Sequence, residues 1–356
     1  MRLSRRGFCG AAAATVAVPL RASEGAWIAA TDPRLRFEGR TAVTGPGRIG
    51  CAFPGIVVRL DARATHVGLG VRSSDATFLD VSIDGGAPAR VAVAAGEQIV
   101  PLVRDEAARR RIEVVKRNGP WHNLLEFTGV ALDGDLLAAP VPPPRRLLFI
   151  GDSITCGSNA DWPDLTAPEG PEHDDARQCY AAVLARRLGA QRHLVAYGGK
   201  GVLRDWQGRT DVVTAGQFYT RALPDDPASR WRATDYVPEA VGICLGTNDF
   251  NPGIPDRAAF VDAYLALVAQ VRADAPAAPI IVIDSPMTAD EPGAMKRTAL
   301  RTYLHEVVAR AASPLVRRGP VAHYPGRPGR DAHPTGEQHL AMAGELEPLF
   351  RQALGG

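Results

Sequence analysis

A proline-rich stretch at residues 138–144 divides the chain into two parts with different hydrophobic patterns. Before it, short β-rich segments alternate with turn residues, at 56–60, 66–71, 78–83, 90–93 and 111–115. Short strands at this spacing are typical of a β-sandwich. After it, strand-like segments alternate with longer segments whose apolar residues recur at helical spacing. The stretch itself has the composition of a stiff, extended linker, so we predict one domain over 30–140 and a second over 145–356.

The second part has the order of elements that forms a parallel sheet. We predict strands at 147–150, 193–197, 240–245 and 280–283, and helices near 180–188, from 256, over about 294–311 and from about 335. Strands and helices that alternate build a sheet with helices on both faces. The predicted fold class is therefore α/β, with a jelly-roll-like β-sandwich followed by a three-layer α/β/α domain. Ligands of such sheets bind beyond the carboxyl ends of the strands, so residues directly after each strand are the candidates for chemistry.

A serine and a histidine are the candidate nucleophile and base. Ser153 follows the first strand of the second domain and leads into a helix, where its Oγ is exposed beside the helix amino terminus. His333 lies in a loop before the last helix and can accept the proton of a serine hydroxyl. Each has an ordinary alternative, because a serine here can be a helix cap and a loop histidine can be a surface residue. The G-x-S-x-G elbow is absent, which disfavours the standard α/β-hydrolase fold.

Two further motifs offer hydrogen-bond donors. Gly-Gly-Lys-Gly at 198–201 follows the second strand, and its bare backbone can present N–H groups to an oxyanion. Asn248, in Gly-Thr-Asn-Asp after the third strand, has a side-chain amide that can be another donor. A glycine-rich turn alone indicates little. The four motifs together, three of them directly after strands, form a specific pattern.

The motifs Gly-Asp-Ser, a glycine turn, Gly-Thr-Asn-Asp and His-Pro resemble those of the SGNH (GDSL) hydrolase family. With the N-terminal sandwich and the Gly-Lys-Gly turn, the chain is most similar to carbohydrate esterase family 2, bacterial enzymes that remove acetyl groups from xylan and related polysaccharides. The resemblance runs from about residue 38 to the end. It implies that Ser153 is the nucleophile and His333 the general base. It also implies an oxyanion hole formed by the Ser153 and Gly199 N–H groups and the Asn248 amide, with Gly201 as the alternative to Gly199.

The carboxylate of a Ser–His–Asp triad is the least defined part of the predicted site. The wider family places its aspartate three residues before the histidine, and that position here is Arg330. Asp331 lies two residues before His333 and is the candidate catalytic aspartate that orients the imidazole. The resemblance leaves a second reading open, a Ser–His dyad whose imidazole is oriented by a backbone carbonyl.

Aromatic residues in the segments 158–177 and 202–239 are candidates for contacts with substrate. Aromatic side chains suit sugars, because they bury CH-rich surface while the hydroxyl groups remain hydrated. Trp206 and Trp231 are the predicted substrate-binding pair. Ordinary loop packing is the alternative for each.

Residues 1–22 have the pattern of an export signal. The pair Arg5 and Arg6 precedes an apolar run at 8–20, and the segment ends on small residues at Ala22. The paired arginines resemble the bacterial twin-arginine form. The run has about 13 residues, fewer than the roughly 20 that a spanning helix needs, so we expect cleavage, no membrane anchor and a periplasmic or secreted protein. That compartment permits a disulfide between Cys156 and Cys179, which the spacing alone does not establish.

The sequence thus predicts an exported serine esterase that removes acetyl groups from a xylan-like polysaccharide or oligosaccharide through an acyl-enzyme. Basic and acidic residues nearly balance, 41 against 39, so the expected partner is an acetylated carbohydrate and not a nucleic acid. No Cys/His set has zinc spacing, and we expect no metal or other cofactor. A periplasmic lipase or thioesterase on the same fold, and a non-catalytic carbohydrate-binding protein, are the alternatives. No oligomeric state is predicted.

Overall fold

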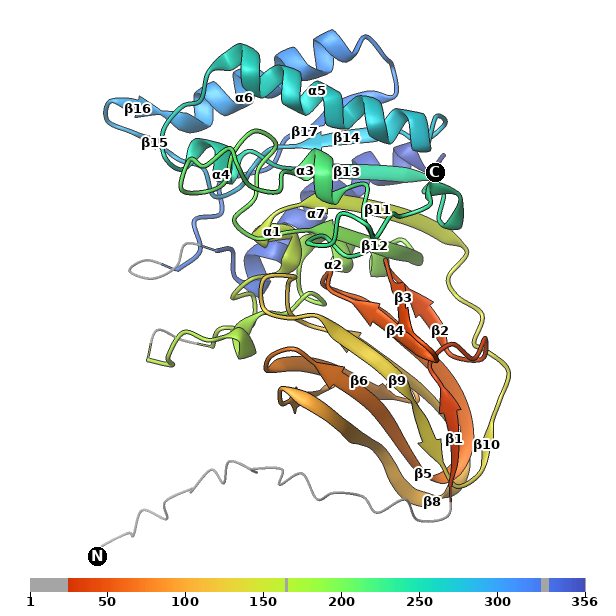
Figure 1. Cartoon of the computed structure of the whole chain (residues 1–356). Helices are drawn as coiled ribbons and strands as arrows, with labels where there is room; N and C mark the ends of the chain where they lie inside the picture. The colour runs from red at the N-terminus through yellow and green to blue at the C-terminus, as the bar shows by residue number, and fades with distance from the viewer. Residues whose placement is uncertain (1–24, 164–165, 328–332, 356) are drawn as a thin grey trace, which may run out of the picture.

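The structure is a computed structural model that describes residues 25–163, 166–327 and 333–355 (Figure 1). Within these ranges an antiparallel β domain is followed by a domain with a parallel sheet, which confirms the predicted fold class. The predicted export signal at 1–22 lies outside the described residues. No helix in the described part of the chain is long and apolar enough to cross a membrane.

The first domain is a sandwich built around two long strands, β5 (Val57–Ser73) and β8 (Gly96–Lys116), which pair along nearly their whole length. One half of β5 also pairs with β9, and the other half with β2 and β10, so the two strands run through both layers. Leu60, Leu69 and Phe127, from both halves, belong to one buried apolar cluster. The remaining strands are β1 (Ala26–Ala29), β2 (Arg36–Glu38), β3 (Ala42–Gly45), β4 (Arg48–Cys51), β6 (Thr77–Ile83), β7 (Ala89–Val93), β9 (Leu125–Leu132) and β10 (Asp135–Leu136).

One detail of the sandwich differs from the sequence prediction. The segments 56–60 and 66–71 were predicted as separate strands, but both lie within β5. Its pairing with β8 shifts register between Ala64 and His66. A bulge bends a strand and strengthens its twist without ending it, which is how one strand can serve two layers.

The second domain contains a sheet of five parallel strands in the order β12-β11-β13-β14-β17. Their bounds are β11 (Arg145–Gly151), β12 (Ala190–Ala196), β13 (Ala240–Cys244), β14 (Ile280–Ile283) and β17 (Val316–Gly319). The first four overlap the predicted segments, although β12 begins at Ala190, before its predicted start at 193. β17 was not predicted, because as an edge strand with two arginines it lacks the continuous apolar run of a buried parallel strand.

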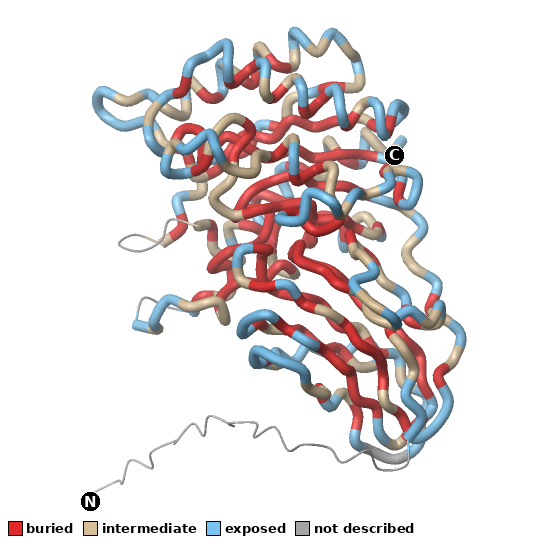
Figure 2. Tube along the Cα trace, in the orientation of Figure 1, coloured by how far each residue is buried: buried red, intermediate tan, exposed pale blue. Residues whose placement is uncertain are grey.

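Helices cover both faces of this sheet, as predicted. Side chains alternate along β11, so that Leu148 and Ile150 join the apolar cluster under α5 and α6 while Leu147 and Phe149 join the cluster under α2 and α7. Figure 2 shows the buried strands between the more exposed outer helices. The helices are α1 (Ser153–Cys156), α2 (Tyr180–Arg187), α3 (Ala215–Phe218), α4 (Thr247–Phe250), α5 (Arg257–Asp274), α6 (Lys296–Ala311) and α7 (Gly336–Ala353). Short 3-10 turns lie at Pro171–His173 and Ala233–Asp235, and a small hairpin joins β15 (Asp290–Glu291) to β16 (Ala294–Met295).

The strand order defines where a ligand can bind. After β11 the chain forms β12 on one side of it and then crosses to form β13 on the other side. Open α/β sheets bind ligands beyond the carboxyl ends of their strands at such a reversal. The segments that follow β11, β12 and β13 therefore meet at one place.

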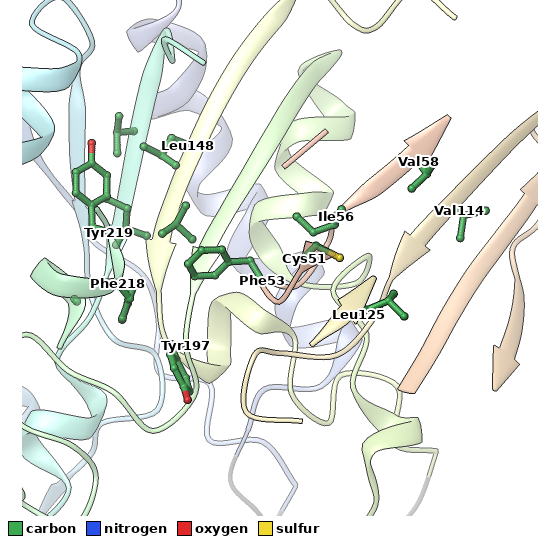
Figure 3. Close-up of a cluster of buried hydrophobic side chains, with 14 of the residues drawn as sticks. Cys51, Phe53, Ile56, Val58, Val114, Leu125, Leu148, Tyr197, Phe218 and Tyr219 are labelled. Carbon is green, nitrogen blue, oxygen red and sulfur yellow. The ribbon is translucent and has the colours of Figure 1, made fainter. Parts of the chain in front are cut away.

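The two domains share an apolar core at their junction. Phe53 and Ile56, in the loop between β4 and β5, are fully or almost fully buried. The ring of Phe53 meets that of Phe218 of α3 edge-on, with centroids 6.3 Å apart (Figure 3). Because one continuous cluster contains residues of both domains, the sandwich is packed against the second domain and not only tethered to it.

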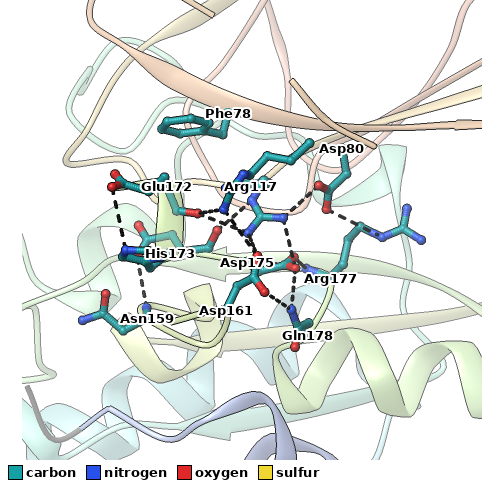
Figure 4. Close-up of polar contacts among 12 residues, drawn as sticks. Phe78, Asp80, Arg117, Asn159, Asp161, Glu172, His173, Asp175, Arg177 and Gln178 are labelled. Carbon is teal, nitrogen blue, oxygen red and sulfur yellow. Dashed lines mark hydrogen bonds and ion pairs between the residues drawn. The ribbon is translucent and has the colours of Figure 1, made fainter. Parts of the chain in front are cut away.

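A buried arginine adds polar contacts at the same junction. Arg117, directly after β8, donates to Asp80 of the sandwich at 2.8 Å (Figure 4). It also donates to Asp161 at 2.6 Å and to Asp175 at 3.2 Å, both from the second domain. Burial and the neighbouring charge of Asp175 raise the pKa of the Asp80 carboxyl. The guanidinium therefore compensates buried carboxylates from both domains.

The cysteines of the described residues are unpaired. Cys51, Cys156, Cys179 and Cys244 are all buried and free, so the Cys156–Cys179 bridge left open by the sequence is not formed. Burial raises the pKa of the Cys179 thiol to about 11. A thiol with so little thiolate reacts slowly with oxidants.

We predict that Arg117→Met destabilises the protein by about 3–5 kcal/mol, because it leaves Asp80 and Asp175 buried without their main counter-charge. Arg232→Met is the matched control, since Arg232 also pairs with a carboxylate, Asp235, but its side chain is 79% exposed. Exposed pairs contribute at most about 1 kcal/mol. Denaturant unfolding of both variants measures the difference. Equal losses would contradict the role given to Arg117.

Candidate active site

The candidate nucleophile lies at the reversal point of the sheet. β11 ends at Gly151, and α1 begins at Ser153. The Asp152 side chain caps this helix by accepting the N–H of Ile154 at 3.0 Å. The cap fixes the sharp turn from strand to helix, and Ser153 lines a cavity at this end of the sheet.

The candidate base reaches this serine from the opposite end of the domain. His333 Nε2 lies 2.6 Å from Ser153 Oγ, a hydrogen bond between residues 180 positions apart. His333 precedes α7, whose start is fixed by a capping box between Thr335 and Gln338. The structure therefore brings together the serine and the histidine that the sequence singled out, at a distance suited to proton transfer.

Two backbone N–H groups beside the serine are candidates for the oxyanion hole. The N–H groups of Ser153 and Gly199 have no acceptor among the described residues. Gly199 has a φ of +74°, which favours glycine. Gly201 is placed differently: a Cβ there would collide with the Asp249 carboxylate, and Gly201 does not line the cavity. Of the two glycines, Gly199 is the one at the site.

The Asn248 amide also faces this point. Asn248 follows β13 in α4, and its Nδ2 donates to the Lys200 backbone oxygen at 2.9 Å. A second contact of Nδ2, to Asp152 Oδ2, is long at 3.5 Å. One amide hydrogen is therefore committed to positioning the side chain, and the other can be given to a developing oxyanion.

Two buried aspartates support these groups, and sequence reasoning gave neither a role. Asp249 accepts the backbone N–H groups of Val202, Leu203 and Arg204, at 2.8–3.2 Å, and so holds the segment after the glycine turn. Asp152 is fully buried beside Ser153. Burial raises the pKa of its carboxyl to about 6, although the Ile154 N–H and the charge of His333 act in the opposite direction.

The cavity has a volume of about 630 Å³ and is lined by both domains. The predicted residues Ser153, Gly199, Asn248 and His333 line it together, and Trp206 lies on its wall. Trp121 and His122 reach it from the loop between β8 and β9 of the sandwich. Sequence reasoning missed these two, because nothing in the chain indicates which sandwich loop faces the second domain. The other lining residues are Ser158, Asn159, Glu169, Gly170, Pro171, Asp174, Tyr197, Gly198, Lys200, Thr247, Asn251 and Met287.

The prediction of Trp231 as a substrate-binding residue is not supported by its position. Among the described residues that line the cavity, Trp231 is absent. Its ring instead lies over the buried guanidinium of Arg40, 5.2 Å from the ring centroid, and meets His193 edge-on. Cation–π packing in the domain junction accounts for this side chain. The position of Trp231 therefore agrees with ordinary packing, the alternative considered above.

The predicted catalytic aspartate, Asp331, lies outside the described residues. No group of three or more His, Cys, Asp or Glu side chains arranged to hold a metal ion is found in the described ranges.

Comparison with protein families gives two matches that together span most of the chain. Residues 149–341 match the GDSL-like Lipase/Acylhydrolase family. Residues 37–142 match the family described as Carbohydrate esterase 2 N-terminal. The boundary between the matches falls in the proline-rich stretch and the start of β11.

Comparison with individual proteins supports the same family. The chain is 33% identical over 333 residues to an acetylxylan esterase / glucomannan deacetylase of Cellvibrio japonicus, covering 92% of this chain and 91% of that protein. A family two carbohydrate esterase structure from Cellvibrio japonicus has a TM-score of 0.88 at 32% identity, covering 93% and 98% of the two chains. One from Clostridium thermocellum in complex with cellohexaose has a TM-score of 0.83 at 29% identity, covering 90% and 99%. The chain belongs to the GDSL-like lipase/acylhydrolase family and, within it, to carbohydrate esterase family 2.

Proposed function

We propose that the protein is an exported serine esterase that removes acetyl groups from xylan-like polysaccharides or oligosaccharides through an acyl-enzyme. The observation that carries the proposal is the 2.6 Å contact between Ser153 Oγ and His333 Nε2, inside a cavity that is also lined by the candidate oxyanion donors Gly199 and Asn248. Family membership supports the ester hydrolysis. The export step rests on residues 1–22 alone.

The first half-reaction forms the acyl-enzyme. Ser153 Oγ attacks the acetyl carbonyl carbon while His333 Nε2 accepts its proton. The carbonyl oxygen becomes an oxyanion, stabilised by the Ser153 and Gly199 N–H groups and by Asn248 Nδ2. When the tetrahedral intermediate collapses, the ester C–O bond breaks, and His333 returns the proton to the departing sugar oxygen. The acetyl group is then bonded to Ser153.

The second half-reaction releases acetate. His333 accepts a proton from a water molecule, whose oxygen attacks the acetyl carbon. The same donors stabilise the second oxyanion, and the proton passes to Ser153 Oγ as the bond to acetate breaks.

The cavity lining favours a sugar over a long acyl chain as the larger half of the substrate. Trp121, Tyr197 and Trp206 are aromatic, and most of the other lining residues are polar. Met287 is the one long aliphatic side chain among the described lining residues. A lipase or thioesterase needs an extended groove of aliphatic side chains for its acyl chain, whereas the apolar part of this lining comes largely from aromatic rings. The relatives named for acetylxylan and the structure with cellohexaose support the same substrate class.

The proposal is tested with purified mature protein on acetylated xylan, mannan and peptidoglycan fragments. We expect acetate release from the xylan or mannan fragments. We also expect strong preference for acetyl over octanoyl esters of one alcohol. Faster octanoyl hydrolysis would favour the lipase reading, and binding without any acetate release would favour a non-catalytic carbohydrate-binding protein.

Ser153→Ala should lower kcat for acetate release by at least about 10³-fold, and His333→Ala by nearly as much, because nucleophile and base act as one unit. Asn248→Ala should cost about 10²–10³-fold, the usual effect of losing one oxyanion donor. Ser158→Ala is the control, since Ser158 also lines the cavity but makes no hydrogen bond with His333. Ser153→Ala activity within about tenfold of wild type would exclude the assigned nucleophile.

Asp331 is proposed as the carboxylate that orients His333. In a full triad, loss of this carboxylate costs about 10⁴ in turnover, whereas a dyad held by a backbone carbonyl loses far less. Pro334 biases His333 toward an extended backbone and restrains the loop bend that contact requires. We therefore expect Asp331→Asn to lower kcat by about 10–10³-fold. If Asp331→Asn and Asp331→Ala both retain near-wild-type kcat, the site is a Ser–His dyad.

A further inference from the structure

The sandwich contributes two residues to the cavity wall, and both lie in the loop between β8 and β9. His122 Nε2 is 2.9 Å from Asp174 Oδ2, so this loop is anchored to the second domain. Trp121, next to it, is 38% exposed although the domain junction around it is closely packed. A large aromatic side chain left accessible inside a cavity is a candidate for ligand contact.

Trp121 packs directly on the glycine turn that carries an oxyanion donor. A Cβ on Gly198 would lie 2.5 Å from Trp121 Cζ3, and a Cβ on Gly119 would also collide with this ring. The indole is nearly parallel to the ring of Tyr197, at 17° with centroids 6.5 Å apart. The six-membered part of the indole is thus held between residues of both domains.

Trp206 packs on Gly199, the next residue of the turn, as Trp121 packs on Gly198. A Cβ on Gly199 would lie 2.9 Å from Trp206 Cδ1. Trp206 is 50% exposed, and its backbone N–H donates to the Gly199 oxygen at 3.0 Å. One tryptophan from each domain therefore flanks the Gly198-Gly199 turn, beside the atom to which the acetyl carbonyl must bind.

The polar parts of both indoles are unused. Neither Nε1–H group has an acceptor among the described residues. Both indoles are accessible, Trp121 at 38% and Trp206 at 50%, so these N–H groups can be given to a ligand in the cavity. A pyranose ring can supply CH groups that pack on the apolar surface of both indoles. Its hydroxyl or ring oxygens can accept hydrogen bonds from the two N–H groups.

We propose that Trp121 is a specificity-determining residue, which contacts the sugar ring that carries the acetyl ester and forms with Trp206 one aromatic subsite shared by the two domains. The inference rests on the proposed function. It makes the sandwich a part of the substrate site, and not only a brace or a separate binding module. Because His122 and the packing on glycine fix the indole before substrate arrives, little ordering entropy is lost on binding.

The test compares two substrates that release the same product. Acetylated xylo-oligosaccharides present a sugar ring, whereas ethyl acetate presents no ring to either tryptophan. Trp121→Ala should lower kcat/KM for the oligosaccharide by about 10–30-fold, the scale of a well-packed aromatic contact, mainly through KM. Any loss of kcat/KM for ethyl acetate should be much smaller, because that substrate has no ring to contact the indole. Trp206→Ala should likewise lower kcat/KM much more for the oligosaccharide than for ethyl acetate.

Trp27→Ala is the matched control. Trp27 is a half-exposed tryptophan of the same domain that also packs on glycines, Gly70 and Gly129, but it does not line the cavity. Trp27→Ala should leave kcat/KM unchanged for both substrates. Trp121→Phe keeps a ring on the glycines but lacks the N–H group, so an intermediate loss for the oligosaccharide is expected. This variant decides the question if Trp121→Ala does not fold.

Equal losses of Trp121→Ala on both substrates would show that the indole only supports the glycine turn, and would overturn the inference. Unchanged rates on both would overturn it as well. A wild-type protein that cleaves ethyl acetate but no acetylated carbohydrate would refute the proposed function and this inference together. Oligosaccharide hydrolysis lost in Trp206→Ala but not in Trp121→Ala would refute this inference alone.

Discussion

Three parallel strands that end at the same level are the constraint on which the site depends. Gly151, the last residue of β11, pairs with Ala196 of β12 on one side and with Cys244 of β13 on the other. The segments that follow carry Ser153, the glycine turn and Asn248. A shift of two residues along any of these strands moves its segment by about 7 Å. The ladder of backbone hydrogen bonds therefore brings the proposed oxyanion donors to the same edge of the sheet.

Two buried carboxylates hold the segments after these strands in position. Asp249 holds the chain after the glycine turn through three N–H groups, and Asp152 caps the helix that begins at Ser153. Burying a carboxylate is unfavourable unless hydrogen bonds compensate it. Both carboxylates accept backbone N–H groups, and burial nevertheless raises the pKa of each, that of Asp152 to about 6. Asp152 of Gly-Asp-Ser and Asp249 of Asn-Asp thus hold the backbone around the site in place. Their contacts give neither of them a part in proton transfer.

The sequence was informative where a feature is determined locally. The helix α5 begins after Asp256, as predicted, because that side chain accepts the Ala259 N–H. The catalytic motifs were found because strand ends in an α/β sheet converge by topology. The edge strand β17, the position of Trp231 in the domain junction and the contribution of Trp121 to the cavity were not found. Each of these depends on which surfaces pack together, and a pattern within one segment does not encode that.

The domain junction therefore has consequences for chemistry as well as for stability. The shared apolar cluster around Phe53 and the ion pairs of Arg117 fix the sandwich against the sheet. That packing in turn fixes Trp121 on Gly198, one residue from the Gly199 donor. Displacements of about 1 Å at a site of this kind can cost about 10² in rate. A change deep in the junction can thus alter substrate turnover without touching a catalytic residue.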